Sequence, residues 1–500
     1  MNDVKIKLNS VRNYKINKAK KAVIMIQKTN ENSNGVKNFP TILIIFGATG
    51  DLMERKLLPA IFYLYQNGFL PKLFQVIGFA KENFTEKEYR DWLRKNLPKR
   101  KGIEDFLKKF FYQPGLFENI ENYFQIGKRL GQIDGEFKVC ANKLFYLAVP
   151  PNYYETIFKN LARSGLTKPC GPKEGWTRVL VEKPFGENLS VAKKLDRLLG
   201  QLFKEIQVFR IDHYLAKETV QNILVFRFAN SVFESVWNKN FIEKIEIKLL
   251  EKEGVEKRGY LYDTLGALRD VGQNHLLQML ALVTMDVPSD LTPETISQKK
   301  LAIFKSLPKM REKEVKTQTV RAQYQGYRQI PGVNPNSQKE TYFKIKTYLN
   351  NPRWQGVPIF LESGKKMKED LVEITVTFKE RRPCPFCLPG REYKNTLCFH
   401  IKPREGITYC FFTKKPGEKT EIEKQSLHFF YQEAYPKKKL LPEYERLLID
   451  AFVGDQTLFI STKEILAMWQ FIDPILKCWQ KNIPPLKIYG DNTTKRQGKS

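Results

Sequence analysis

The chain has 500 residues, of which 42% are hydrophobic, and its formal net charge of +30 gives a pI of about 9.6. This length is enough for two hydrophobic cores, because single cores stop growing at roughly 250 to 300 residues. No apolar run approaches the roughly 20 residues that cross a bilayer, and the early run at 22–26 is too short for a signal peptide. The composition therefore argues against a membrane-spanning protein and predicts a cytoplasmic one.

The excess of basic residues suits an anionic partner, which can be nucleic acid, a membrane surface or a small phosphorylated molecule. Lysine dominates and is spread along the whole chain, without a helix-turn-helix, zinc-finger or RNP-like pattern. We therefore expect a solvated basic surface that attracts a small phosphorylated substrate and a dinucleotide. Nucleic-acid binding is the alternative.

Both ends of the chain are expected to be tails. Residues 1–37 contain two acidic and nine basic residues and show no sustained periodicity, which predicts a disordered basic extension. A transit peptide would also be basic, but it is typically rich in arginine and serine rather than lysine. Residues 491–500 are expected to form a second, polar tail.

A glycine-containing turn follows the first apolar segment. The β-branched run at 41–46 predicts a buried strand, and helical spacing resumes at 55–62. The turn consists of Gly47, Ala48, Thr49, Gly50, Asp51 and Leu52. Its glycines let the backbone approach a pyrophosphate, which then meets free N–H groups and the positive end of the helix dipole. The turn is therefore a candidate dinucleotide-binding site.

The end of the next predicted strand bears on the choice of dinucleotide. Residues 74–80 read as a strand that ends at Lys81 and Glu82. In a Rossmann fold an acidic group here suits the ribose 2′-hydroxyl of NAD, and a basic group suits the 2′-phosphate of NADP. Lys81 supplies charge without the bidentate fork of arginine, and Glu82 opposes it. We expect NADP as the cofactor, with NAD possible.

Residues 210–217 bring four chemically distinct side chains into one or two turns of chain. Asp212 can hold an imidazole in one tautomer. His213, Tyr214 and Lys217 can donate hydrogen bonds or positive charge to a phosphate dianion. The segment therefore predicts a phosphorylated substrate and requires a second histidine.

The second histidine is His275, which ends the segment 269–275 and precedes the apolar residues 276–280. This pattern predicts a largely buried helix. A neutral imidazole with a pKa near 6.5 suits a general base near neutral pH. A histidine paired with an aspartate is more often structural in an arbitrary sequence, so the pairing alone does not establish catalysis.

Five segments together resemble the glucose-6-phosphate dehydrogenase family. They are the glycine turn, EKPFG at 182–186, the two histidine segments RIDHYLAK at 210–217 and RDVGQNHLLQ at 269–278, and RWQGVPIFLESGK at 353–365. The resemblance covers about residues 40–490. It implies that the protein oxidises the C1 hydroxyl of glucose 6-phosphate to the lactone and passes hydride to NADP or NAD, the first step of the oxidative pentose phosphate pathway.

The resemblance also implies roles for individual residues. His275 is the expected general base, and Asp212 is expected to orient it. Lys183 is expected to touch both substrate and cofactor, while Lys81 and the glycine turn hold the cofactor. The expected substrate-binding residues are Lys183, His213, Tyr214, Lys217, Glu251, Asp270 and Lys365.

The implied fold combines an α/β and an α+β part. Residues 38–208 are expected to form a Rossmann-like coenzyme-binding domain, and residues 209–490 a β+α substrate and dimerisation domain with a large, mainly antiparallel sheet. A homodimer or homotetramer is expected. Two alternatives stay open, namely a catalytically idle nucleic-acid-binding protein on this fold and an NAD-preferring hexose 6-phosphate dehydrogenase.

Seven cysteines scattered over the chain do not indicate a disulfide framework. Cys384, Cys387, Cys398 and His400, followed by Cys410, have ligand types that suit zinc, and Cys398 and His400 would share one face of a strand. The usual second pair of ligands is missing, so no metal is assigned and the question stays open. No structural nucleotide is expected, since Glu362, Asp370, Thr408 and Cys410 replace the basic residues that hold it in animal members of the family.

Overall fold

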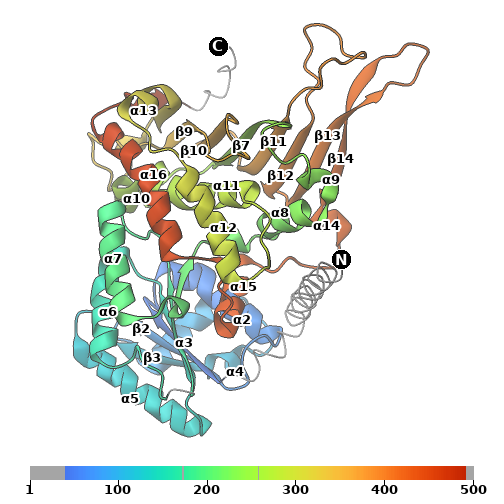
Figure 1. Ribbon diagram of the computed structural model, residues 1–500. Coiled ribbons are helices and arrows are strands. Elements are labelled where there is room, and N and C mark those ends of the chain that lie inside the picture. Colours follow the sequence, from blue (N-terminus) through green and yellow to red (C-terminus); the bar gives the residue numbers. More distant parts are fainter. Residues whose placement is uncertain (1–39, 172–173, 257, 491–500) are drawn as a thin grey trace, which may run out of the picture.

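The computed structural model describes residues 40–171, 174–256 and 258–490, and the tails expected at 1–37 and 491–500 lie outside this range. The described chain forms two β-sheets with helices packed around them (Figure 1). The first sheet lies at the bottom of the view and the second at the top, and β13 and β14 extend beyond the rest of the molecule.

Seven strands form the first sheet, in the order β15-β6-β5-β4-β1-β2-β3. They are β1 (Thr41–Phe46), β2 (Phe74–Ala80), β3 (Phe110–Pro114), β4 (Asn142–Leu147), β5 (Thr177–Val181), β6 (Val208–Ile211) and β15 (Phe459–Ile460). Six of them are parallel, and β15 joins antiparallel to β6. All residues of β1 are buried, as expected for a parallel strand that is covered on both faces. The Rossmann-like prediction is thus confirmed.

Nine strands form the second sheet, in the order β14-β13-β12-β11-β7-β10-β9-β8-β16. They are β7 (Ile242–Leu250), β8 (Thr319–Tyr324), β9 (Tyr342–Thr347), β10 (Ile359–Gly364), β11 (Leu371–Phe378), β12 (Thr396–Lys402), β13 (Gly406–Lys414), β14 (Ile422–Phe430) and β16 (Lys487–Tyr489). Only the pairs β7–β10 and β8–β16 are parallel within this described sheet, which confirms the prediction of a mainly antiparallel sheet.

Helices cover both sheets. Around the first sheet lie α2 (Leu58–Gln66), α3 (Glu86–Lys95), α4 (Ile103–Leu107), α5 (Ile120–Phe137), α6 (Tyr154–Arg163) and α7 (Leu189–Leu202), with η1 (Met53–Leu57), η2 (Pro151–Tyr153) and η3 (Glu205–Gln207). The rest are η4 (His213–Ala216), α8 (Glu218–Ala229), α9 (Ser231–Glu234), α10 (Gly259–Leu265), η5 (Leu268–Leu276), α11 (Leu277–Thr284), α12 (Pro293–Ser306), α13 (Glu312–Gln318), η6 (Tyr327–Gln329), α14 (Tyr431–Ala434), α15 (Glu443–Val453) and α16 (Thr462–Gln480).

The second sheet is apolar on one face only. In β9 and β11 buried residues alternate with partly exposed ones, so successive side chains point to opposite faces. The buried face packs against α8 and η5. The other face carries polar side chains, as is usual for an antiparallel sheet.

The two sheets meet at η5, which brings residues far apart in sequence together. The carboxyl end of β5 leads to Lys183, which bonds to Asp270 on η5, and the end of β6 leads to Asp212, which bonds to His275 on the same helix. Two elements from the C-terminal part of the chain also pack near this junction. Strand β15 pairs with β6, and α15 packs on α2 and η4. The boundary expected between 208 and 209 stays a prediction.

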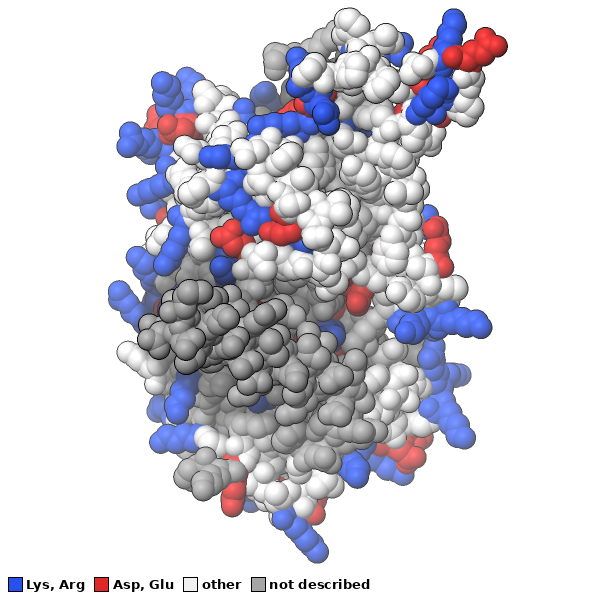
Figure 2. All heavy atoms as spheres, turned by 45° about the vertical axis from the view of Figure 1, so that its right-hand side comes forward, with Lys and Arg blue, Asp and Glu red and all other residues white. Residues whose placement is uncertain are grey.

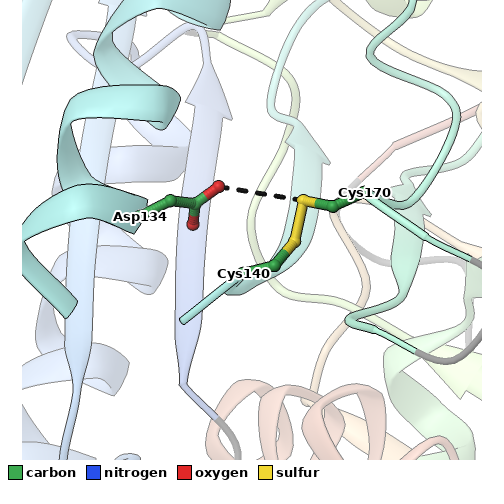
Figure 3. A group of neighbouring side chains, drawn as sticks. All are labelled: Asp134, Cys140 and Cys170. Carbon is green, nitrogen blue, oxygen red and sulfur yellow. Dashed lines mark hydrogen bonds between the residues drawn. A yellow bond between two sulfur atoms is a disulfide. The ribbon is translucent and has the colours of Figure 1, made fainter. Parts of the chain in front are cut away.

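The expectation of unpaired thiols is wrong for four of the seven cysteines. Cys140, two residues before β4, and Cys170, in the loop that leads to β5, are joined by a disulfide with Cα atoms 6.4 Å apart (Figure 3). Their strands β4 and β5 are parallel neighbours, so the segments that lead into them start side by side. Cys384 and Cys387 form a second disulfide within one tight turn. The sequence spacing of 30 residues gave no sign of the first pairing.

Charged side chains of both signs are present on the face that Figure 2 shows, where Lys and Arg lie in separate groups with Asp and Glu among them. Within the described residues, each helix is either too short or too polar to cross a membrane.

Candidate active site

Asp212 and His275 form a buried hydrogen-bonded pair. Asp212 directly follows β6 and caps η4, where its Oδ1 accepts a hydrogen bond from the Tyr214 N–H at 3.0 Å. The same oxygen lies 2.5 Å from Nδ1 of His275, and both side chains are at most 2% exposed. Because a carboxylate can only accept, the imidazole proton sits on Nδ1 and leaves Nε2 free to accept a proton.

Electrostatics keep this pair in the charge state that a general base needs. Burial lowers the pKa of His275, and the neighbouring Asp212 carboxylate offsets that effect only in part. Burial alone would raise the pKa of Asp212, but its contact with His275 and the nearby Lys183 ammonium bring it below its usual value. A neutral imidazole therefore faces an ionised carboxylate near neutral pH.

His275 is carried by a π-helix, η5, instead of a regular α-helix. Such wide turns are rare and are found frequently at functional sites. Gly272 lets the helix pack closely on β9, since a Cβ there would lie 2.6 Å from Leu268 Cδ1 and 2.9 Å from the Phe343 ring. The predicted buried helix is present, although its π geometry was not foreseen.

His213 and Tyr214 flank the imidazole of His275. The ring centroid of His275 lies 4.8 Å from that of His213 and 4.3 Å from that of Tyr214. Burial and the neighbouring His275 lower the pKa of His213 well below its ordinary value. His213 can therefore offer a neutral N–H donor to a ligand, rather than a positive charge.

Three lysines carry the positive charge of the site, and each is held by a carboxylate. Lys183 Nζ donates to the Asp270 carbonyl at 2.7 Å and to its Oδ1 at 3.1 Å. The other two pairs are Lys217 with Glu443 and Lys365 with Glu251. The carboxylates fix the ammonium groups in place, so a phosphate would meet cations that are already ordered.

The three lysine–carboxylate pairs lie around the side chain of Tyr214. The charges of Glu251, Asp212, Glu443 and Asp270 all act on the Tyr214 hydroxyl, whose pKa is raised mainly by burial. Burial would raise the pKa of Asp270 as well, but Lys183 and Lys365 lower it, so this carboxylate is ionised. The structure thus brings together all the residues that were expected to bind substrate.

Two acidic residues of the site were missed by sequence reasoning. Glu443 begins α15 and reaches Lys217 from 226 residues away in the chain. Glu182 precedes Lys183, is partly buried and accepts a hydrogen bond from the Tyr146 hydroxyl at 2.6 Å, and desolvation raises its pKa to about 7. Glu182 opens the EKPFG segment, which was the available signal, whereas Glu443 depends on tertiary contact alone.

The glycine turn has the close packing expected of a dinucleotide site. Gly47 has a φ of +83°, and a Cβ there would lie 2.4 Å from the Ala148 carbonyl oxygen, so only glycine fits. The turn leads through Asp51 and Leu52 into η1 and then α2. It follows β1, which lies between β2 and β4 in the sheet, and α/β sheets bind their ligands beyond the carboxyl ends of the strands.

The residues after β2 are arranged differently from the buried pair. Lys81 is exposed, whereas Glu82 is partly buried and accepts a hydrogen bond of 2.6 Å from the Thr49 hydroxyl. Arg55 forms an exposed ion pair with Asp51 at 2.7 Å. The acidic group at this strand end is therefore anchored to the glycine turn.

Comparisons with known proteins agree on one family. The family model "Glucose-6-phosphate dehydrogenase, NAD binding domain" matches residues 44–222, and the corresponding C-terminal domain matches residues 224–498. Glucose-6-phosphate 1-dehydrogenase of Chlamydia muridarum is 37% identical over 92% of this chain and 94% of its own length. That of Borreliella burgdorferi is 39% identical over 89% and 92%.

Solved structures give the same result. A glucose-6-phosphate dehydrogenase in complex with its substrate glucose-6-phosphate superposes with a TM-score of 0.85 at 32% identity, covering 92% of this chain and 96% of that one. The glucose-6-phosphate 1-dehydrogenase of Mycobacterium avium gives a TM-score of 0.78 at 30% identity, covering 91% and 94%.

Proposed function

The chain belongs to the glucose-6-phosphate dehydrogenase family, and we propose that it oxidises glucose 6-phosphate to the 6-phosphoglucono-lactone. The single observation that carries this proposal is the buried pair of Asp212 and His275, with Nδ1 bonded and Nε2 free. Nε2 of His275 takes the proton of the C1 hydroxyl, and Asp212 stabilises the imidazolium that forms. A nicotinamide dinucleotide, when bound, accepts the hydride from C1.

The three lysines and their neighbours hold the substrate. Lys183, Lys217, His213 and Tyr214 bind the phosphate, while Lys365, Glu251 and Asp270 hold the sugar hydroxyls. The phosphate lies away from the reacting carbon, so its binding energy serves to position C1 against His275. The lysine–carboxylate ion pairs support this assignment of the phosphate and sugar ligands, because they fix the ammonium groups before the substrate binds.

The glycine turn holds the pyrophosphate of the cofactor. The close approach at Gly47 supports this role, since any larger residue would push the turn away from Ala148. Gly47, Ala48, Thr49, Gly50, Asp51 and Leu52 line this part, with Lys81 towards the ribose and Lys183 towards the nicotinamide. We infer that both NADP and NAD are used, because Lys81 attracts a 2′-phosphate and the anchored Glu82 repels it.

A steady-state absorbance assay tests the proposal. Purified protein with glucose 6-phosphate and NADP or NAD should form reduced nicotinamide, and omission of the sugar phosphate should abolish the signal. Absence of activity with both cofactors, together with tight and salt-dependent binding of DNA or RNA, would instead support the catalytically idle alternative. Activity with several hexose 6-phosphates and a clear preference for NAD would support the other alternative.

A further inference from the structure

A cluster of potential metal ligands lies on the second sheet, on elements that the active site does not use. It consists of Glu373 on β11 and Cys398 and His400 on β12, and one ligand atom of each lies within 4.8 Å of the other two. Glu373 pairs with His400 across the two strands, and Thr375 pairs with Cys398. Because alternate residues share a face of a sheet, the three ligands point to the same side.

The distances within the cluster match those of a tetrahedral zinc site. Cys398 Sγ lies 3.5 Å from Glu373 Oε2 and 3.5 Å from His400 Nδ1. Ligands bound to zinc at about 2.0 to 2.3 Å in tetrahedral directions are separated from one another by about 3.5 Å. An ion could therefore enter between the three atoms with little movement of the backbone.

The surroundings of the cluster orient its ligands. His400 Nε2 lies 2.9 Å from the Thr408 hydroxyl, which in turn lies 3.1 Å from His428 Nδ1. With Nε2–H donating to Thr408 and Thr408 donating to His428, the lone pair on Nδ1 of His400 faces the cluster. Lys248 Nζ lies 3.6 Å from the other oxygen of Glu373. Hydrogen-bonded partners of this kind typically fix metal-binding histidines and carboxylates.

We propose that Glu373, Cys398 and His400 bind one zinc ion, with a fourth position left to a water molecule. Binding replaces the Cys398 thiol proton, which passes to solvent, and the thiolate and carboxylate balance the two charges of the ion. The ligand set combines a carboxylate, a thiolate and an imidazole. Cys384 and Cys387 are not part of it, since they are bonded to each other in a disulfide. The ordinary alternative is a partly buried thiol that donates a hydrogen bond to Glu373.

Metal content of the full-length protein tests the proposal. After equilibration with zinc and dialysis, elemental analysis should find about one zinc ion per chain above background. Cys398→Ser and, separately, His400→Gln should reduce it to near zero. Replacement of zinc by cobalt should give a thiolate-to-metal charge-transfer band that Cys398→Ser abolishes. Added zinc should raise the thermal midpoint of the parent protein but not that of either variant.

Two control variants separate this site from other metal-binding groups. Cys410→Ser removes a free thiol on the neighbouring strand β13 and should keep the zinc. The double variant Cys140→Ser with Cys170→Ser removes the sulfur atoms next to Asp134 (Figure 3) and should also keep it. Absence of zinc from the parent protein, or its loss only in one of these controls, would overturn the assignment.

Discussion

The pair Asp212–His275 and the strand end Lys81–Glu82 both have a part in the proposed reaction, yet the structure holds them in very different ways. The pair is almost completely buried, and each member has a fixed partner. At the strand end Lys81 is exposed, and only Glu82 is tied down, by one hydrogen bond from Thr49. The buried pair therefore holds a single geometry, while the exposed side chain of Lys81 is free to take several positions.

His275→Ala should have the largest effect of the substitutions proposed here, and it tests the role of the buried pair. We expect kcat to fall by about two to four orders of magnitude, because proton abstraction is lost, while KM changes by only a few-fold, because the phosphate ligands stay. Asp212→Asn should give a milder loss. Steady-state kinetics of both variants checks this, with His428→Ala as a matched control that should keep activity. Near-normal turnover of His275→Ala would contradict the assignment of the base.

Glu182 should couple the stability of the buried region to pH. Its pKa of about 7 lies well above the ordinary value of 4.5 that it has in the unfolded chain, so its contribution to stability is fully present below pH 4.5 and is lost as the pH rises through 7. Glu182→Gln removes this titration. The stability difference between pH 4.5 and pH 8 should therefore shrink by on the order of 3 kcal/mol.

Urea denaturation of the parent protein and of Glu182→Gln at both pH values measures the difference. Glu118→Gln, at an exposed position, is the control and should leave the pH dependence unchanged. An equal pH dependence in the parent protein and in Glu182→Gln would show that the carboxylate does not titrate in this range.

Lys217→Ala should raise KM for glucose 6-phosphate by roughly 10- to 100-fold, because a charge-assisted contact is worth about 1.5 to 3 kcal/mol. His213→Ala should have a smaller effect, at most about tenfold, because the low pKa of His213 makes it a neutral donor. Free glucose has no phosphate, so its KM should change little in either variant if both residues bind the phosphate. Lys439→Ala, at an exposed lysine, is the control. Equal losses with glucose and glucose 6-phosphate would contradict the phosphate role.

The sequence predicted those features that depend on local chemistry. The run at 41–46 is a buried parallel strand, and Gly47 is a glycine because its φ is positive and Ala148 leaves no room. The segments around Asp212 and His275 indicated a pair, because a carboxylate can hold an imidazole in one tautomer and because both segments resemble those of one family.

Other features depend on contacts between distant segments, which periodicity does not report. The disulfide of Cys140 and Cys170 follows from the pairing of β4 with β5. The ion pair of Lys217 with Glu443 follows from the packing of α15 on η4. The π-helix at 268–276 requires an unusual backbone that no residue type in it demands. These features could not be predicted from the spacing of residues alone.

The smallest effect is expected at the exposed strand end, where two opposite charges nearly cancel. A partly exposed contact between Lys81 and a 2′-phosphate is worth about 1 kcal/mol, so the preference for NADP over NAD should be roughly tenfold or less. Arg55 adds little in its present position, because it is paired with Asp51. Glu82→Ser should shift the ratio of kcat/KM values towards NADP, and Lys81→Ala should shift it towards NAD.

Thr49→Val sharpens this last comparison, because it leaves the charge of Glu82 in place and removes the hydrogen bond that anchors it. If the anchored position matters, this variant should shift preference in the same direction as Glu82→Ser, but by less. Lys305→Ala, an exposed lysine on α12, controls for net charge and should leave the ratio unchanged. A ratio that none of the three variants at 49, 81 and 82 alters would place the 2′-site elsewhere, and the strand end would then have no part in cofactor choice.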